Sequence, residues 1–209
     1  MPPPVEFFYG TGSRYSYLAS TRLERLAAET GCEVRWRPLY SGDLFAARGR
    51  DPFRGQPVSG QYDWAYRRQD ALRWAAYYGV PYREPDDVRF EPPRLALAAT
   101  AAAALGAVAP FSRRLFRALF VDGLSPLDDA ACTRLAGEVG LDEEGFRGTL
   151  AQPETAARLA ATVEEAAARG LFGVPSFVVG EEVYFGNDRL PLLRHALQNA
   201  SSSPTAPDR

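Results

Sequence analysis

The stretch that decides the fold is Val5-Glu6-Phe7-Phe8-Tyr9, followed by Gly10-Thr11-Gly12 and then by Ser13-Arg14-Tyr15-Ser16-Tyr17-Leu18-Ala19. The first segment is apolar and rich in aromatic residues, which is typical of a buried strand. The glycines mark a turn, and Ser13 stands where a helix N-cap is expected. The sequence therefore predicts a strand that leads through a short turn directly into a helix.

The residues that follow complete a βαβ unit. Over 15–30 apolar residues recur at helical spacing, and Gly31 is expected to end this single helix. Apolar and charged residues alternate over 32–37, which predicts a strand that Pro38 closes. Two strands joined in this way within about forty residues are expected to be parallel, with a right-handed crossover.

The middle of the chain is predicted to be helical. A loop is expected over 41–60, with one short helix around 44–47. Helical patterns then cover five segments: 62–78, 95–105, 111–121, 128–139 and 153–169. A glycine follows each pattern within two residues, and such a glycine is the usual C-terminal stop.

The end of the chain returns to β structure. Strands are predicted over 177–179 and 183–185, and the turn Gly180-Glu181-Glu182 between them indicates a hairpin. Asn187 or Asp188 is expected to cap a last helix. The domain prediction is a βαβ half over 1–45, an inserted helical subdomain over 46–169, a ββα half over 170–200 and a disordered tail over 201–209.

Composition narrows the classes of function. The chain has 209 residues, 46% of them hydrophobic, and a net charge of −2, so we expect one composite domain with no strong affinity for nucleic acid or for an anionic membrane. Its two cysteines give no disulfide, zinc or haem spacing and fit a reducing compartment. The N-terminus lacks the pattern of a secretory signal, so the predicted location is cytoplasmic, and no metal site is expected.

Ser13 has two interpretations. In the simpler one, Ser13 or Ser16 only caps the helix, because a serine hydroxyl accepts a hydrogen bond from a backbone N–H two or three residues further on. In the functional one, the free N–H groups and the positive end of the helix dipole stabilise an anion. A thiolate is a suitable anion, and a serine hydroxyl that donates to it would lower the thiol pKa.

Two further segments are candidates for binding. Pro175 directly precedes the first strand of the hairpin, and a cis bond there would expose the backbone N–H and C=O of Val174 to a peptide-like ligand. Asn187 and Asp188 are explained by a helix cap alone, or else they hold a zwitterion that carries a carboxylate and an amine. No nucleotide-binding or serine-hydrolase motif is present. The aromatic residues of the first long helix are expected to lie mostly in the core, although they are numerous enough to line a pocket: Tyr62, Trp64, Tyr66, Trp74, Tyr77 and Tyr78.

These segments together resemble a known family. The S-x-x-S at 13–16 has the position and spacing of the C-x-x-C of thioredoxin-like proteins. Residues 8–19 are similar to the motif F-Y-x-x-x-S-P-Y-S-Y-L-A, and residues 66–81 to Y-x-x-x-D-x-x-R-W-A…G-x-P. Residues 170–190 resemble the more specific G-V-F-G-V-P-T-F-x-V-G…F-x-G-x-D-R-L. This pattern resembles the branch of the DsbA-like thioredoxin superfamily that contains 2-hydroxychromene-2-carboxylate isomerases and kappa-class glutathione transferases.

The resemblance implies a fold, a cofactor and an assembly. The fold is α/β, a thioredoxin fold interrupted by an all-helical inserted subdomain. The cofactor is glutathione, and the assembly is a homodimer that acts on a small-molecule substrate. By position, Ser13 matches the catalytic serine that contacts the glutathione sulfur, and Val174 before Pro175 matches the residue that pairs with the cysteinyl unit. Asn187 and Asp188 match the pair that grips the γ-glutamyl end.

In the isomerases, as the resemblance implies, the thiolate adds to a conjugated chromene carboxylate. The ring opens, rotation about the former double bond follows, and elimination returns glutathione unchanged. Arg14 departs from the pattern because it replaces the proline after the serine, where a cation would lower the thiol pKa further or bind a substrate carboxylate. Asp63 stands where the family has a lysine that reaches the glycyl carboxylate, and Pro93 lies in a segment that lacks the family's asparagine. Arg54, Arg67 and Arg68 are the candidates to compensate.

Three functions therefore stand open. The leading hypothesis is a glutathione-dependent isomerase of a small aromatic or conjugated acid. The alternatives are a kappa-like glutathione transferase and a non-enzymatic, degenerate thioredoxin-like binding module. Disulfide oxidoreductase activity is disfavoured because Cys32 and Cys132 are predicted to lie in separate subdomains.

Overall fold

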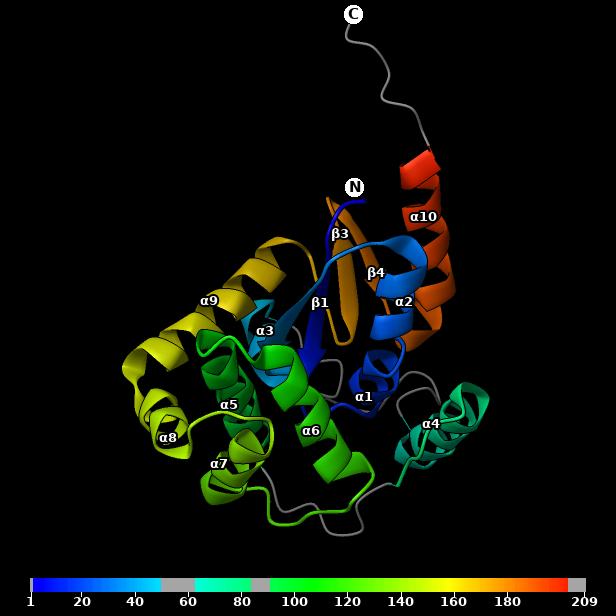
Figure 1. Cartoon of the computed structure of the whole chain (residues 1–209). Helices are drawn as coiled ribbons and strands as arrows, with labels where there is room; N and C mark the ends of the chain where they lie inside the picture. Colours follow the sequence, from blue (N-terminus) through cyan, green and yellow to red (C-terminus); the bar gives the residue numbers. More distant parts are fainter. Residues whose placement is uncertain (1, 50–62, 84–90, 203–209) are drawn as a thin grey trace, which may run out of the picture.

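The computed structural model describes residues 2–49, 63–83 and 91–202. A four-stranded sheet has the order β2-β1-β3-β4. Its strands are β1 (Val5–Gly10), β2 (Val34–Leu39), β3 (Ser176–Val179) and β4 (Glu182–Phe185). Strand β1 is parallel to β2 and antiparallel to β3, and β3 is antiparallel to β4, so the two ends of the chain build one sheet (Figure 1). The predicted class, an α/β thioredoxin fold interrupted by helices, is confirmed.

Helices surround this sheet and fill the interval between β2 and β3. In chain order the helices of the described residues are α1 (Arg14–Ser20), α2 (Leu23–Thr30), α3 (Ser41–Ala47), α4 (Trp64–Tyr78), α5 (Pro92–Ala104), α6 (Val108–Phe120), α7 (Asp129–Glu138), α8 (Glu143–Ala151), α9 (Pro153–Ala168), the 3₁₀ turn η2 (Asn187–Arg189) and α10 (Leu190–Ser202). The short helix predicted near 44–47 and the five longer helical patterns are confirmed as α3, α4, α5, α6, α7 and α9, with their ends shifted by a few residues.

Both faces of the sheet are covered. Phe7 and Tyr9 of β1 point into the larger core, which includes residues of α1, α2, α5, α6 and α10. Phe8 points to the opposite face, into a smaller core with residues of α3 and α9. Figure 1 shows α9 on one side of the sheet and α2 and α10 on the other. This arrangement explains why β1 is apolar at consecutive positions, since a strand buried on both faces lacks a polar side.

The inserted helices are tied to the sheet at one buried polar contact. The hydroxyl groups of Tyr9 and Ser112 are hydrogen-bonded, and α6 supplies the serine. Burial raises the pKa of Tyr9, so this phenol stays protonated. The bond therefore fixes α6 against the same strand that leads to Ser13.

The single helix predicted over 15–30 is wrong, because the structure contains two. Helix α1 ends at Ser20 and α2 begins at Leu23. At the break, the hydroxyls of Ser20 and Thr21 donate hydrogen bonds to the carbonyls of Tyr17 and Leu18. Such back-bonding competes with the helical ladder, which is why polar hydroxyl residues favour helix ends.

Pro38 does not close its strand. Strand β2 continues to Leu39, and Pro38 lies opposite Tyr9 in the parallel ladder. Because β2 is at the edge of the sheet, a proline that lacks an N–H is tolerated there.

Two further differences concern the helices. The sequence analysis did not predict α8, although Asp142 caps it by accepting the Gly145 N–H at 2.6 Å and Phe146 and Leu150 form a buried pair on one face. Helix α10 also extends through Ser202, so the first two residues of the predicted tail are helical, and 203–209 lie outside the described residues.

Candidate functional site

A cleft of about 600 Å³ opens at the end of β1. The residues that line it come from the β1–α1 turn, from β2 and α3, from the first turns of α4 and α5, from the segment before β3 and from the end of β4: Gly10, Thr11, Gly12, Ser13, Arg14, Leu39, Tyr40, Ser41, Phe45, Arg48, Trp64, Arg67, Pro92, Phe172, Gly173, Val174 and Phe185. Gly10 allows two of these segments to touch, because a Cβ at this position would lie only 3.1 Å from Val174 Cγ2.

Ser13 lies at the N-cap of α1, facing this cleft. Its backbone is extended, with φ −92° and ψ 118°, and its Oγ accepts the Ser16 N–H at 3.2 Å. The predicted cap is therefore present. A hydroxyl has one donor and two lone pairs, so the Ser13 proton is still available to a ligand.

The second serine of S-x-x-S has a different position. Ser16 is buried, and its Oγ lies 3.3 Å from the Gly10 N–H that donates to it. It holds the turn after β1 in place. Of the two serines, only Ser13 lines the cleft.

Val174 lines the same cleft as Ser13. The Val174–Pro175 peptide bond is cis. Among the described residues, neither the N–H nor the C=O of Val174 has a hydrogen-bond partner. The carbonyl of Pro175 accepts the Gly186 N–H at 2.9 Å, which anchors this segment to the end of β4. The structure thus brings Ser13, Arg14 and Val174 together around one cavity.

Asn187 and Asp188 do not line that cavity. The predicted cap is also wrong, because both residues lie inside the turn η2, whose N-cap is Gly186, and α10 begins only at Leu190. Asn187 is buried, and its carbonyl accepts the Tyr78 hydroxyl at 3.0 Å. Its side-chain Nδ2 has no hydrogen-bond partner among the described residues.

Three arginines of the cleft carry positive charge toward it. Arg14 and Arg67 lie over the ring of Trp64, with guanidinium carbons 5.3 and 5.2 Å from the ring centroid. Arg48 donates to the carbonyl of Leu171 at 2.8 Å, which fixes α3 beside the segment that leads to β3. The sequence predicts Arg14 and Arg67 as ligand contacts. It does not predict Arg48, because Arg48 belongs to no recognisable motif.

Asp63 has a structural role at the position of the family's lysine. Its Oδ1 accepts the Tyr66 N–H at 2.8 Å and caps α4. One turn later on the same helix, Arg67 lines the cleft, whereas Arg68 does not. Arg54 lies outside the described residues.

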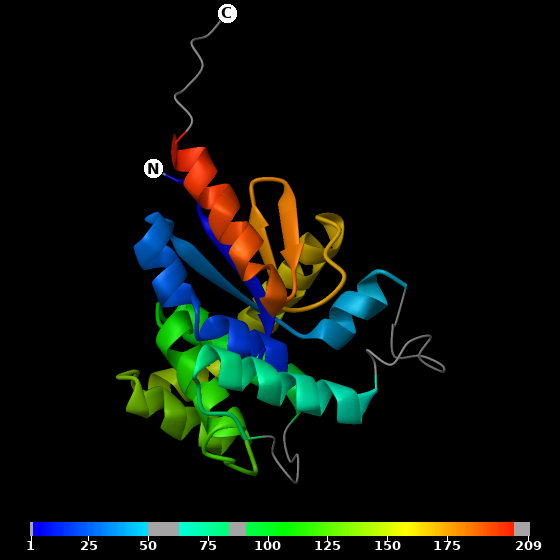
Figure 2. The same cartoon turned by 90° about the vertical axis from the view of Figure 1, so that its right-hand side faces the viewer.

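The aromatic residues of α4 are not mainly core residues, contrary to the prediction. Trp64 is 63% exposed and Tyr77 is 80% exposed, and Tyr66 is also exposed. Tyr62 lies outside the described residues. The reason is the position of α4, which lies alongside α1 at the molecular surface (Figure 2) and buries only Ala71 and Ala75.

Tyr15 connects the cleft to the rest of α4. Its hydroxyl donates to Asp70 Oδ2 at 2.9 Å, and the Arg67 guanidinium lies 5.5 Å from its ring centroid. Burial, together with the hydrogen bond to the negative Asp70, raises the pKa of Tyr15 to about 12. The phenol is therefore neutral at physiological pH and acts as a donor that orients Asp70.

Cys32 and Cys132 are both buried and unpaired, and burial raises the pKa of the Cys132 thiol to about 12. The described residues contain no cluster of His, Cys, Asp and Glu suited to a metal ion. Nor does any helix in the described part of the chain have the length and apolar character needed to span a bilayer.

Comparison with known proteins identifies the family of the chain. The model of the DSBA-like thioredoxin domain matches residues 4–198. The chain belongs to this family. It is 28% identical over 204 residues to a 2-hydroxychromene-2-carboxylate isomerase of Pseudomonas putida, a match that covers 95% of this chain and 98% of the relative.

Two solved structures are similar to this chain over nearly its whole length. A 2-hydroxychromene-2-carboxylate isomerase superimposes with a TM-score of 0.80 at 27% identity, covering 96% of this chain and 99% of the other. The cytosolic disulfide reductase DsbM from Pseudomonas aeruginosa, solved with GSH, gives a TM-score of 0.66 at 22% identity over 96% of this chain and 100% of its own. The second likeness shows the shared fold alone.

Proposed function

We propose that the protein is a glutathione-dependent isomerase that acts on a small aromatic or conjugated acid, as 2-hydroxychromene-2-carboxylate isomerases do. The observation that supports this proposal most strongly is the cleft that the Ser13 hydroxyl, at a helix N-cap, shares with Val174, whose backbone has no hydrogen-bond partner among the described residues. The similarity to enzymes named as isomerases over nearly the whole chain supports an enzyme of this kind.

The residues present fit glutathione. Thr11 Oγ1, in the cleft wall, and Asn187 Nδ2 are buried polar atoms without a hydrogen-bond partner among the described residues. Buried polar groups are normally paired, so such atoms mark places where a polar ligand would complete the network. The free peptide group of Val174 and the positive charges of the cleft suit a tripeptide that carries peptide bonds and carboxylates.

Each candidate residue receives a role in this proposal. Ser13 donates its hydroxyl proton to the ligand's sulfur, and Val174 pairs through its backbone with the cysteinyl unit. Arg67 binds the glycyl carboxylate in place of the missing lysine. Asn187 and Asp188, which lie outside the cleft lining, hold the γ-glutamyl end where the ligand extends beyond the cleft, past Gly186, toward η2. Bound glutathione supplies a thiol nucleophile that the chain itself lacks in this cleft.

The electrostatics of the cleft favour the thiolate form of such a ligand. Arg14 directly follows Ser13 and shares the cleft with it. A nearby cation and the N–H groups of a helix N-terminus both stabilise an anion, so they lower the pKa of a thiol placed there. The exposed Trp64 ring and the arginines beside it provide a flat surface and a counter-charge for an aromatic carboxylate.

A kappa-like glutathione transferase would use the same residues, because transfer and isomerisation both need an activated thiol. The test is calorimetric titration with glutathione of the wild type and of Ser13→Ala, followed by a balance of free thiol during turnover of a conjugated aromatic acid. Constant thiol supports the isomerase, whereas thiol consumption supports the transferase. A wild type that does not bind glutathione contradicts both and leaves the non-enzymatic binding module.

We further propose that the protein works in the cytoplasm as a homodimer. Two buried, unpaired cysteines support a reducing compartment, and the resemblance to the isomerase branch supports the dimer. Sedimentation velocity of the purified chain tests the homodimer directly, because it measures the oligomeric state.

A further inference from the structure

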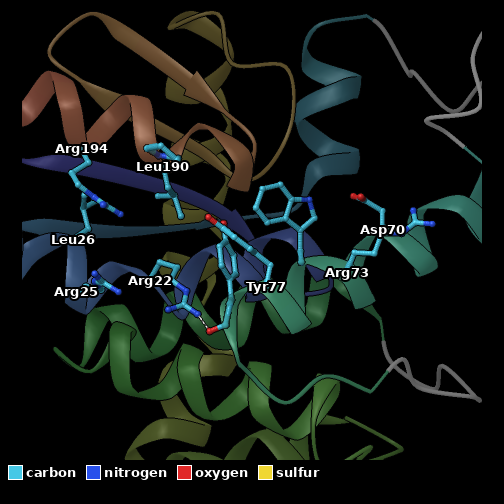
Figure 3. Close-up of a pocket in the computed structure, with 11 residues that line it drawn as sticks. Arg22, Arg25, Leu26, Asp70, Arg73, Tyr77, Leu190 and Arg194 are labelled. Carbon is cyan, nitrogen blue, oxygen red and sulfur yellow. Dashed lines mark hydrogen bonds between the residues drawn. The ribbon is translucent and has the colours of Figure 1, made fainter.

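A second cavity, of about 510 Å³, lies outside the Ser13 cleft and between α2, α4 and α10. None of its residues lines the cleft. They are Arg22, Arg25, Leu26, Asp70, Arg73, Trp74, Tyr77, Tyr78, Leu190, Pro191 and Arg194. Figure 3 shows them arranged around the space between the three helices. The volume lies within the range of small-molecule pockets.

Positive charge gathers at one end of this pocket. In Figure 3, Arg22 and Arg25 of α2 and Arg194 of α10 lie at one end, and Asp70 and Arg73 of α4 lie at the other. Among the ion pairs of the described residues, one carboxylate neutralises this first end, because Glu29 pairs with both Arg25 and Arg194. This end therefore holds three guanidinium groups against one carboxylate.

The donors at this end are incompletely used. Arg22 donates to the carbonyl of Tyr78 and lies 4.4 Å from the centroid of its ring, but within the described residues it has no carboxylate partner. Its Nε is buried without a hydrogen-bond partner, and so is the Nε of Arg194. The latter lies 3.1 Å from Glu29 Oε2, close enough for an ion pair but without hydrogen-bond alignment. Arg22 Nε thus lacks an acceptor, whereas Arg194 Nε already faces the Glu29 carboxylate.

A cluster of rings lies between the two charged ends. The ring centroids of Trp74, Tyr77 and Tyr78 are 5.2 to 5.7 Å apart. Tyr77 is 80% exposed, which is unusual for so large a side chain. An exposed aromatic surface next to an excess of guanidinium groups suits a planar, negatively charged molecule.

We propose that this pocket is a second ligand site, one that binds a planar aromatic ring bearing a carboxylate or another strongly anionic group. The anionic group is held by Arg22, Arg25 and Arg194, and the ring packs on Tyr77 and Trp74. The site is separate from the cleft and does not depend on the function proposed for Ser13.

A second copy of the chain is a poorer occupant. A two-fold interface places a patch against the same patch of its partner. Both copies would then carry the excess positive charge of this end into the interface, and like charges brought together across an interface are unfavourable. An anion avoids this repulsion and supplies the acceptor that Arg22 Nε lacks.

The test uses tryptophan fluorescence and 2-naphthoate as the probe. The chain has three tryptophans, of which Trp64 lines the cleft, Trp36 is buried in the core and Trp74 lines the pocket. In a Trp64→Phe background, quenching by 2-naphthoate therefore reports the pocket. We expect saturable quenching that is at least tenfold weaker in affinity when Arg25→Gln and Arg194→Gln are combined. Neutral 2-naphthalenemethanol is expected to bind at least tenfold more weakly than the acid.

The matched control is Arg158→Gln, which removes an exposed arginine of α9 far from the pocket in sequence and outside its lining, and it should leave the quenching unchanged. Tyr77→Ala tests the ring independently if the double variant does not fold. Unchanged affinity in both pocket variants contradicts the site. A shift from dimer to monomer in the double variant, in a protein that never binds the probe, would identify the surface as a subunit interface and overturn the proposal.

Discussion

Helix α4 borders two cavities that differ in how they are built. Its first turn lines the Ser13 cleft, whereas its second half lines the arginine pocket between α2, α4 and α10. The cleft is formed largely by loops at the ends of strands, and its polar groups include backbone atoms and a helix cap. The pocket is formed by helices alone, and its polar groups are long side chains.

The difference bears on what each cavity can do. Backbone groups and a cap are held by the sheet, so the cleft offers fixed positions, which is what a reacting atom requires. Guanidinium groups on flexible stems adapt to a ligand but position it less rigidly. The cleft is therefore suited to chemistry and the pocket to binding, and the following variants test that division.

The largest effect is expected for Ser13→Ala. Loss of the hydroxyl removes a donor to a charged sulfur, so kcat/KM of the glutathione-dependent reaction should fall about 10²-fold. The lost cap should cost about 1 kcal/mol of the free energy of unfolding. Ser13→Thr keeps both the hydroxyl and the cap and is the control. Full activity in Ser13→Ala would reduce Ser13 to a helix cap.

The next largest effect is expected when an arginine of the cleft loses its charge. Arg67→Gln should weaken glutathione binding about tenfold in a calorimetric titration, because one charge-assisted contact is lost. Arg68→Gln, its exposed neighbour outside the cleft, should leave binding unchanged. The affinity of the arginine pocket for 2-naphthoate should be the same in both variants. Equal losses in the two variants would mean that only general charge matters.

A smaller effect is expected for Tyr15→Phe, which tests whether the two cavities are independent. Removal of the hydroxyl leaves Asp70 without this donor and should lower the free energy of unfolding by about 1 kcal/mol, measured by urea denaturation. Activity at Ser13 should change less than threefold, whereas binding at the pocket that Asp70 lines should change more. The opposite order would show that Tyr15 serves the cleft.

The last prediction concerns pH. It is the pH dependence of the difference in the free energy of unfolding between the wild type and Tyr15→Phe. The pKa of Tyr15 is about 12 in the folded protein and about 10 in the unfolded chain. A raised folded pKa means that the stabilisation is fully present below pH 10 and is lost as the pH rises through 12. The stability difference between wild type and Tyr15→Phe should therefore shrink between pH 10 and 12. A difference that grows in this interval would contradict the assignment.

The sequence was sufficient where the signal is local. The strand, turn and cap around Ser13 are contiguous, and glycines end the helices, as Gly79 does for α4 at φ +66°. The hairpin and the segment at Val174 are contiguous too. For this reason the fold and the part of the cleft formed by Ser13, Arg14 and Val174 were predictable from the residues and the family motifs.

The sequence was insufficient where the result depends on which surfaces meet. Arg22, Arg73 and Arg194 belong to three separate helices, so no motif joins them before the chain is folded. The position of Asn187 and Asp188 in a 3₁₀ turn likewise depends on the anchor between Gly186 and Pro175. The capping role of Asp63 was missed for a related reason, because the helical pattern was predicted from residue 62, whereas α4 begins only at Trp64.

The burial of Cys32 and Cys132 has a practical consequence for experiments. Each side chain is at most 5% exposed, so a thiol-specific reagent finds no accessible sulfur on the native protein. Any sulfur that it titrates in a native complex must belong to a bound small molecule, and two more equivalents should appear only after denaturation. The native protein without ligand therefore contributes no thiol signal, so the thiol titrated in a native complex gives the number of bound thiol ligands per chain.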